Sequence, residues 1–325
     1  MKNSATQYSD GNKESVTGNL DFWQRYTVRA AQDDMEFMRF RRADAMLKVV
    51  EGSPRTSGIW NLRRLMRSEK FRNCLPLLQA TESIGLPLNL IDFTVNNNVY
   101  SLNPTTLRYA NNILNYLELF GEEILDGTPI YEIGGGYGGE CKVFNDFAST
   151  IYSRNLSECY HIFDLQSSYA LTSKYLSYFK YSTAFLELDR MPPIDSARKG
   201  LVISNGAISE MRGGLLNDYI DKVIQPCTHG YFMTNFESHS LPFGGMSTHQ
   251  FLSRLREIGK VDAVELNATK YLSFFDWQAG TKLIVFGAKQ LADFSPSAID
   301  ALFIRLLHKL IRLNEWSTKK FIDRS

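Results

Sequence analysis

The residues of this chain that most clearly suggest chemistry lie between Tyr131 and Glu140, where the sequence reads YEIGGGYGGE. The acid Glu132 precedes five glycines, which are Gly134, Gly135, Gly136, Gly138 and Gly139. Glycines at a sharp strand-to-helix turn supply backbone angles that other residues avoid, and they let the main chain approach a ligand with no Cβ in between. The segment therefore predicts a loop that binds a nucleotide cofactor.

Two kinds of cofactor loop fit the spacing of these glycines. Gly134, Gly136 and Gly139 satisfy the G-x-G-x-x-G pattern of dinucleotide-binding loops. Together with Glu132, the glycines at 134, 136 and 138 satisfy instead the E-x-G-x-G-x-G pattern of S-adenosylmethionine (SAM) enzymes. The glycines alone do not choose between the two cofactors.

Glu132 favours SAM. A dinucleotide loop holds a pyrophosphate against the N–H groups at a helix end, and a carboxylate beside it would repel that anion. SAM carries no phosphate, and its ammonium and sulfonium groups are cationic. A carboxylate near the loop therefore attracts SAM.

A second acid, Asp164, ends the second predicted strand in YHIFDLQ. At this position of an open α/β sheet a carboxylate can accept both ribose hydroxyls of the cofactor, and Leu165 beside it is assigned to the same site. An Asp at a strand end can instead cap the following helix, here the stretch from Ser168.

The fourth predicted strand ends in SNGAISEM, and ligands of open α/β sheets bind beyond the carboxyl ends of the strands. Asn205 is therefore assigned to the cofactor site, and Ser209 and Glu210 are expected near the transferred group. A positioned base that takes the proton of a sugar hydroxyl would speed transfer about a hundredfold or more, and Glu210 is one candidate. The alternative role for Glu210 is a carboxylate that stabilises a helix N-terminus.

The loop after the fifth predicted strand contains Asn235, Glu237, His239 and His249. The ordinary pKa range of histidine suits a base, so His239 is the second catalytic candidate, and His249 is assigned to the acceptor site. Glu210, Asn235 and Glu237 could hold a divalent metal, but their spacing is not diagnostic and no metal is predicted.

Tyr137 stands inside the glycine loop, where we expect that its ring cannot be part of the core. It would cover the cofactor or line the acceptor site.

The composition is that of an ordinary soluble protein. With 36 basic and 35 acidic residues the formal net charge is +1. This charge is too small to attract nucleic acid or an anionic membrane, so neither is expected as a partner. The four cysteines have no metal-ligand spacing and are expected to be reduced thiols. No apolar run is long enough to span a membrane and the N-terminus lacks an apolar signal region, so a cytoplasmic protein is expected.

Three regions are expected along the chain. Residues 1–18 would be a disordered tail, residues 19–127 a helical cap that selects the substrate, and residues 128–325 the cofactor-binding domain. Within the cap, Asn103 is a good N-cap for a helix that continues with apolar residues at helical spacing until Gly121.

From residue 128 onward apolar runs alternate with helical stretches, which predicts an α/β fold with a mostly parallel sheet. The predicted strands are Ile130–Ile133, Tyr160–Phe163, Ala184–Leu186, Leu201–Ser204 and Gly230–Thr234. The crossover helices are Cys141–Thr150, Ser168–Tyr178 and Leu215–Val223. An antiparallel pair, expected more of a SAM methyltransferase than of a dehydrogenase, would close the edge at Val261–Leu266 and Lys282–Phe286. A last helix, expected only to pack, is Ser297–Leu313.

Four segments, LNPTTLRYA, EIGGGYGGE, FDLQ and SNGAISEM, together resemble the sugar O-methyltransferase family over roughly Ser101 to Gly287. The resemblance implies a Rossmann-like SAM methyltransferase domain whose cofactor residues are Glu132, Gly134, Gly136, Gly138 and Asp164. It also points to the acceptor-site residues Arg108, Tyr109 and Tyr137, and to Asn205, Ser209 and Glu210. The chain has FDLQ where the family's second acidic motif is D-L-P, which keeps the carboxylate and changes the local turn.

The expected function is therefore transfer of a methyl group from SAM to a hydroxyl of a sugar, either nucleotide-linked or part of a glycoside or polysaccharide. The acceptor would be a small molecule or a glycan, and a homo-oligomer is compatible with the sequence. Two alternatives stay open. One is an NAD(P)-dependent oxidoreductase that uses the same glycine loop, and the other is a binding module that keeps the fold without catalysis.

Overall fold

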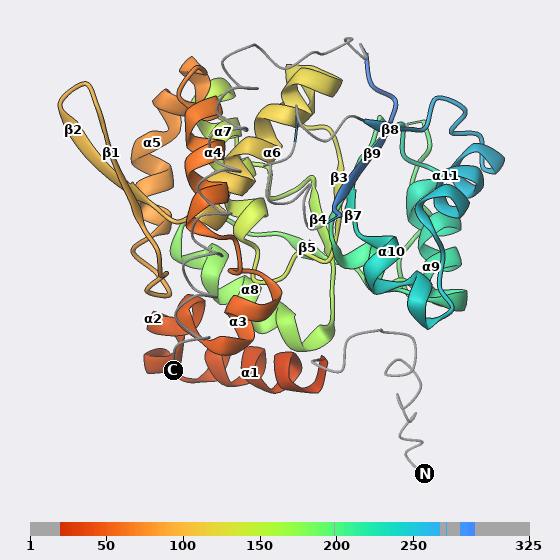
Figure 1. The fold of residues 1–325 in the computed structure, drawn as a ribbon, viewed down its shortest axis with the longest axis horizontal. Helices are drawn as coiled ribbons and strands as arrows, with labels where there is room; N and C mark the ends of the chain where they lie inside the picture. Colours follow the sequence, from red (N-terminus) through yellow and green to blue (C-terminus); the bar gives the residue numbers. More distant parts are fainter. Residues whose placement is uncertain (1–19, 198, 267–270, 272–279, 290–325) are drawn as a thin grey trace, which may run out of the picture.

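A seven-stranded sheet forms the centre of the computed structural model, which describes residues 20–197, 199–266, 271 and 280–289 (Figure 1). Its strands are β3 (Ile130–Ile133), β4 (Tyr160–Phe163), β5 (Ala184–Phe185), β6 (Leu201–Asn205), β7 (His229–Thr234), β8 (Val264–Leu266) and β9 (Lys282–Phe286). Their order is β5-β4-β3-β6-β7-β9-β8. The first five strands are mutually parallel, whereas β9 runs antiparallel to β7 and to β8. The predicted α/β class with its antiparallel end is confirmed.

The strands alternate their side chains between two helical layers, because successive residues of a strand point to opposite faces. Ile130, Ile162 and Ile203 pack toward α7 (Gly139–Tyr152) and α8 (Gln166–Tyr178). On the other face, Ile133 and Phe232 belong to a second cluster with α9 (Gly213–Tyr219), the π-helical turn η5 (Ile220–Ile224) and α11 (Thr248–Glu257). Short segments follow β6 and β7, namely the 3₁₀ turn η4 (Ala207–Glu210), α10 (Phe236–His239) and the 3₁₀ turn η6 (Leu241–Phe243).

The N-terminal half adds a layer of helices over the α7 side of the sheet (Figure 1). They are α1 (Leu20–Gln32), α2 (Asp34–Arg39), α3 (Asp44–Val49), α4 (Arg55–Leu65), α5 (Glu69–Thr81) and α6 (Pro104–Phe120), with 3₁₀ turns η2 (Phe40–Arg42) and η3 (Glu122–Leu125). Helix α6 has the predicted ends, since the Asn103 side chain accepts a hydrogen bond from the Thr105 N–H at 2.7 Å and Gly121 ends it at φ +93°. Helix α6 packs between α4 and α7.

One expectation for this half is wrong, because it is not helical throughout. Strands β1 (Ile91–Val95) and β2 (Asn98–Leu102) form an antiparallel hairpin at the outer edge of the molecule (Figure 1). The two residues between them, Asn96 and Asn97, have φ of +49° and +66°. Positive φ at both central residues is typical of a type I′ hairpin turn, and asparagine tolerates it better than most residues.

A buried ionic cluster ties the N-terminal helices together. The Arg41 guanidinium is fully buried and contacts the Glu51 carboxylate at 2.7 Å and the Glu82 carboxylate at 2.9 Å. Glu51 also accepts a hydrogen bond at 2.5 Å from the hydroxyl of Tyr137, which belongs to the glycine loop. The cluster therefore links the N-terminal half directly to that loop.

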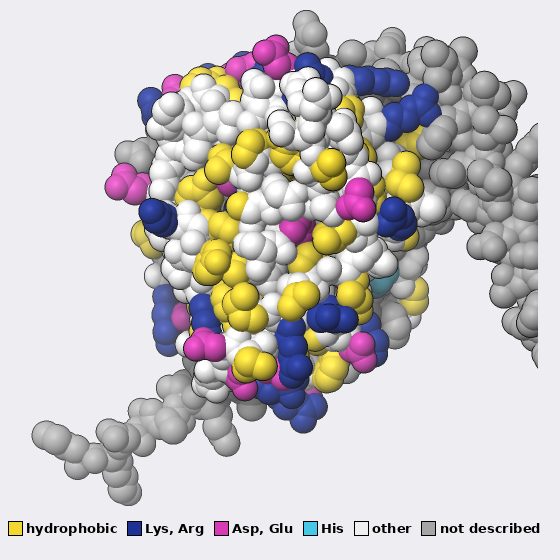
Figure 2. All heavy atoms as spheres, turned by 90° about the vertical axis from the view of Figure 1, so that its left-hand side faces the viewer, with side chains coloured by type: hydrophobic (Ala, Val, Ile, Leu, Met, Phe, Trp, Pro, Cys, Tyr) yellow, Lys and Arg dark blue, Asp and Glu magenta, His cyan; other side chains and the backbone are white. Residues whose placement is uncertain are grey.

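The face that carries α5 and the hairpin has basic and acidic side chains interspersed, with apolar side chains between them (Figure 2). The predicted tail at 1–18 and the predicted last helix at Ser297–Leu313 lie outside the described residues, and so do residues 272–279.

Replacing Glu51 by alanine should lower the free energy of unfolding by about 3–5 kcal/mol, because it leaves part of the buried Arg41 charge uncompensated. Urea unfolding followed by circular dichroism measures this. The matched control is Asp126→Ala, which removes a pair with Arg154 of similar length, 2.8 Å, whose side chains are about half exposed. It should cost less than about 1 kcal/mol. Equal costs for the two variants would contradict the role of the cluster.

Candidate functional site

The glycine loop lies between β3 and α7 and is tightly enclosed. Gly134 has φ +83°, and a Cβ on it would lie 2.2 Å from the Cβ of Ala207 in η4. Gly138 has φ +84°, and a Cβ there would lie 2.7 Å from the Thr172 side chain of α8. Both the backbone angle and the space therefore require glycine at these positions. The loop brings the ends of β3 and β6 and the start of α7 together.

Asp164 holds the loop in place. One carboxylate oxygen accepts from the Gly136 N–H and the other from the Leu165 N–H, each at 2.6 Å. The pKa of Asp164 is raised to about 6. Burial is the largest cause and the nearby Glu210 carboxylate adds to it, whereas the two hydrogen bonds oppose the increase. Leu165 itself precedes α8. Whether Asp164 also binds ribose stays a prediction.

Glu132 points from β3 into the interior on the α7 side and is 3% exposed. It accepts a hydrogen bond from the Tyr160 hydroxyl at 2.9 Å. Burial raises its pKa well above the ordinary range, and the carboxylates of Glu140 and Asp164 raise it further. A Cβ on Gly135 would lie 3.2 Å from a carboxylate oxygen of Glu132. The acid of the motif thus lies directly beneath the glycines.

Glu140 is the functional candidate that the sequence analysis missed. It lies in the first turn of α7, is 2% exposed, and accepts hydrogen bonds from the Tyr116 hydroxyl and from the Asn205 side-chain amide. The amide of Asn112 lies 3.5 Å from the same carboxylate and 3.4 Å from the Asn205 oxygen. The pKa of Glu140 is raised to about 7, and burial is the largest cause. The hydrogen bonds from Tyr116 and the two amides and the charge of Arg108 oppose this increase. The available signal was the run of polar residues in α6, spaced for one helix face.

Glu210 and His239, the two predicted bases, lie on segments that pack together, η4 and α10. Burial raises the pKa of Glu210, and His239 lowers it in turn. The His239 Nδ1 is buried and has no hydrogen-bond partner among the described residues. Because η4 follows β6 and α10 follows β7, both predicted bases lie at the carboxyl edge of the parallel strands, where the glycine loop also lies. Their catalytic role stays a prediction.

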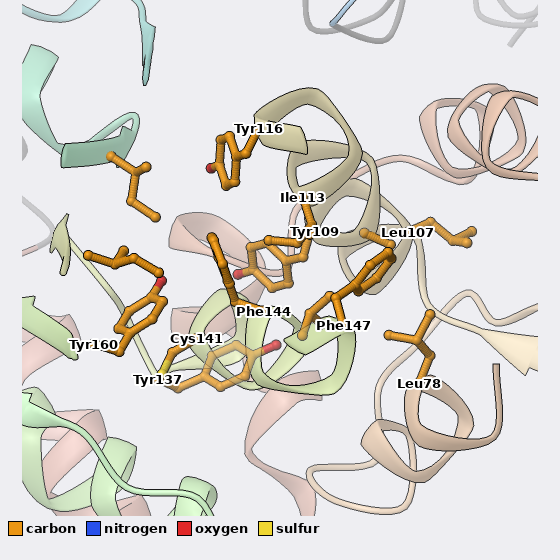
Figure 3. Packing of buried hydrophobic residues seen from close by; sticks show 14 of the residues in the cluster. Leu78, Leu107, Tyr109, Ile113, Tyr116, Tyr137, Cys141, Phe144, Phe147 and Tyr160 are labelled. Carbon is orange, nitrogen blue, oxygen red and sulfur yellow. The ribbon is translucent and has the colours of Figure 1, made fainter. Parts of the chain in front are cut away.

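The expectation for Tyr137 is wrong in one respect, because its ring is part of the core. It is 1% exposed, packs edge-on against Phe40 and Tyr175 at centroid distances of 5.0 Å, and donates to Glu51. Tyr109 is also buried and belongs to the same cluster (Figure 3). The assignment of both rings to the acceptor site stays a prediction. Phe40 and Glu51, from the N-terminal half, and Tyr175 of α8 are partners that the sequence alone did not reveal.

The other predicted acceptor residues are separated. Arg108 is partly exposed on α6, where its Nη2 donates to the Val50 carbonyl at 3.2 Å and its Cζ lies 5.4 Å from the centre of the Tyr109 ring. His249 is exposed in the first turn of α11. No interaction within the described part of the chain joins His249 to Glu210 or His239.

A cavity of about 380 Å³ lies elsewhere, at the amino ends of β3 and β4. Its walls are Gly127, Pro129, Tyr131, Glu158, Cys159, His161, Leu186 and residues 191–195. It is therefore not the site formed by the glycine loop at the carboxyl ends. Among the described residues no group of His, Cys, Asp and Glu could hold a metal ion, and none of the helices is long and apolar enough to cross a membrane.

The solved structures to which this chain is weakly similar include three methyltransferases. A candidate SAM-dependent methyltransferase from Methanococcus maripaludis is 14% identical, with a TM-score of 0.38 over 57% of this chain and 88% of that one. A SAM-dependent methyltransferase from Aquifex aeolicus is 12% identical, with a TM-score of 0.35 over 56% and 97%. An O-methyltransferase family protein from Burkholderia thailandensis is 14% identical, with a TM-score of 0.35 over 56% and 60%.

No family model matches the sequence, and no curated protein matches it. Similarities at this level carry no argument, so the function is inferred from the residues of the site.

Stability should depend on pH through Glu140. Its pKa is about 7 in the folded protein against an ordinary 4.5, so the folded protein holds the proton more tightly. The contribution of this proton to the free energy of unfolding is complete below pH 4.5 and is lost as the pH rises through 7. At 1.36 kcal/mol per pKa unit, the loss is about 3 kcal/mol. Urea unfolding at pH 5 to 8 should show this loss in the wild type and a smaller one in Glu140→Gln. Parallel pH profiles for the two proteins would contradict it.

Proposed function

We propose that this protein is a SAM-dependent methyltransferase that transfers a methyl group to a hydroxyl of a sugar. The observation that carries the proposal is the set of buried carboxylates around the glycine loop, Glu132, Glu140 and Asp164. Each has its pKa raised, and the charges that act on Glu132 are the other two carboxylates. Such a site holds acids whose ionised forms a cation would stabilise and an anion would not.

These acids match SAM and oppose a dinucleotide. A pyrophosphate at the loop would lie next to three carboxylates, and the repulsion in a partly buried site would be large. The ammonium and sulfonium of SAM would instead compensate these carboxylates. The glycines fit the same group, because a loop without side chains allows the closest approach of a ligand to the backbone.

When bound, SAM supplies an electrophilic methyl group on a positively charged sulfur. Transfer of this methyl group to an acceptor oxygen would leave the electron pair of the carbon–sulfur bond on sulfur. The proton of the hydroxyl has to leave, and Glu210 is the proposed base. Its raised pKa suits this role, because a base works best when its pKa lies near the working pH. His239 beside it would stabilise the charge on Glu210 between turnovers.

Sugar as the acceptor is supported by the four segments that resemble the sugar O-methyltransferase family. The N-terminal helices, which contact the glycine loop through Glu51 and Tyr137, would then shape the acceptor side of the pocket. Nucleotide-linked sugars, glycosides and polysaccharides all present the required hydroxyl, and a turnover assay distinguishes among them.

Isothermal calorimetry should detect micromolar binding of SAM and S-adenosylhomocysteine and little binding of NAD. Glu132→Gln should weaken SAM binding at least tenfold, because it removes a buried acid beneath the loop whose ionised form a bound cation would favour. Glu257→Gln, an exposed acid on α11, is the matched control and should bind like the wild type. Binding of NAD alone would overturn the proposal in favour of an oxidoreductase. Binding of SAM without turnover on any sugar would indicate a module without catalysis.

Glu210→Gln should lower kcat about a hundredfold or more and leave the SAM dissociation constant within twofold of the wild type. Release of S-adenosylhomocysteine with a panel of nucleotide sugars measures the rate, and calorimetry measures the binding. Glu257→Gln again serves as the control. A wild-type rate in Glu210→Gln would exclude this residue as the base.

A further inference from the structure

Helix α6 presents polar side chains toward the start of α7. Arg108 and Asn112 are four residues apart, so their side chains are neighbours on one helix face. Asn112 lies within 3.5 Å of both the Glu140 carboxylate and the Asn205 side chain. Asn112 is therefore a neighbour of both Arg108 and Glu140.

Arg108 also reaches the segment in front of the glycine loop. Its Nη2 donates to the Val50 carbonyl, and a Cβ on Gly136 would lie 3.3 Å from the Val50 side chain. The guanidinium is thus attached to a segment that touches the second glycine of the motif. The Arg108 side chain is partly exposed, whereas Glu140 is buried.

The two groups have opposite charges and act on each other, since Arg108 lowers the pKa of Glu140. A guanidinium offers a planar pair of donors that suits a carboxylate, and a carboxylate with neighbouring side-chain amides suits an ammonium. One cation and one anion separated by a single amide side chain are complementary to a zwitterionic α-amino acid. SAM and S-adenosylhomocysteine each carry one, at the end away from the adenine.

We propose that Arg108 binds the carboxylate and Glu140, with Asn112 and Asn205, binds the ammonium of the amino-acid end of the cofactor. This inference rests on the proposed function and assigns Arg108 to the cofactor rather than to the acceptor sugar. Glu132 and Asp164 would then face the rest of the molecule.

The test compares two ligands by calorimetry, S-adenosylhomocysteine and 5′-methylthioadenosine, which has the same nucleoside and no amino-acid end. Arg108→Met should weaken binding of S-adenosylhomocysteine at least tenfold and change that of methylthioadenosine less than twofold. Glu140→Gln should show the same selectivity. Arg108→Lys keeps the positive charge but lacks the planar pair of donors. It should therefore recover part of the affinity for S-adenosylhomocysteine that Arg108→Met loses. Arg154→Met, at an exposed arginine, is the control and should change neither.

The outcomes separate the two proposals. If wild-type protein binds neither ligand, the proposed function fails. If it binds S-adenosylhomocysteine and Arg108→Met binds it equally well, only this inference fails. A loss of both ligands in Arg108→Met and in Arg108→Lys would show that Arg108 supports the fold of the site, which also overturns the inference.

Discussion

The interaction on which the site depends is the mutual repulsion of carboxylates held beside a loop that has almost no side chains. Glu132, Glu140 and Asp164 are kept in the interior by neutral donors, namely tyrosine hydroxyls, asparagine amides and backbone N–H groups. Such donors reduce the cost of each buried charge without neutralising it. The folded protein therefore keeps these acids partly protonated, and a cationic ligand can restore their charge. Under the proposed function, the bound cation would therefore favour the ionised forms of these acids.

The N-terminal half is joined to this site through the interior. Arg41, Glu51 and Tyr137 connect helices far apart in the sequence to the glycine loop, and Val50 next to Glu51 lies against Gly136. A buried ion pair contributes little net stability compared with apolar packing, but it is costly to break. The cluster therefore determines where residues 50 and 51 lie over the loop more than how stable the protein is. That the cap of residues 19–127 selects the substrate remains a proposal.

The sheet could be predicted from the sequence because its parallel strands are short and mainly apolar and alternate with helical stretches, as in Ile130–Ile133 and Tyr160–Phe163. Helix α6 could be predicted because its cap, its first proline and its final glycine are local signals. The hairpin was missed because two adjacent asparagines are a weaker turn signal than Asn-Gly. Tyr137 and Glu140 could not be placed, because their partners Glu51 and Tyr116 are 86 and 24 residues away. Contacts between residues so far apart in the sequence cannot be predicted from the periodicity of either segment.

The central claim is that the site binds a cation by using buried carboxylates that are partly protonated before binding. The most direct measurement is the number of protons exchanged when SAM binds near pH 7, obtained by calorimetry in buffers of different ionisation enthalpy. Since the cation favours the ionised acids, the account predicts release of protons on binding, with a smaller release in Glu140→Gln. Uptake of protons, or binding with no proton exchange in the wild type, would contradict it.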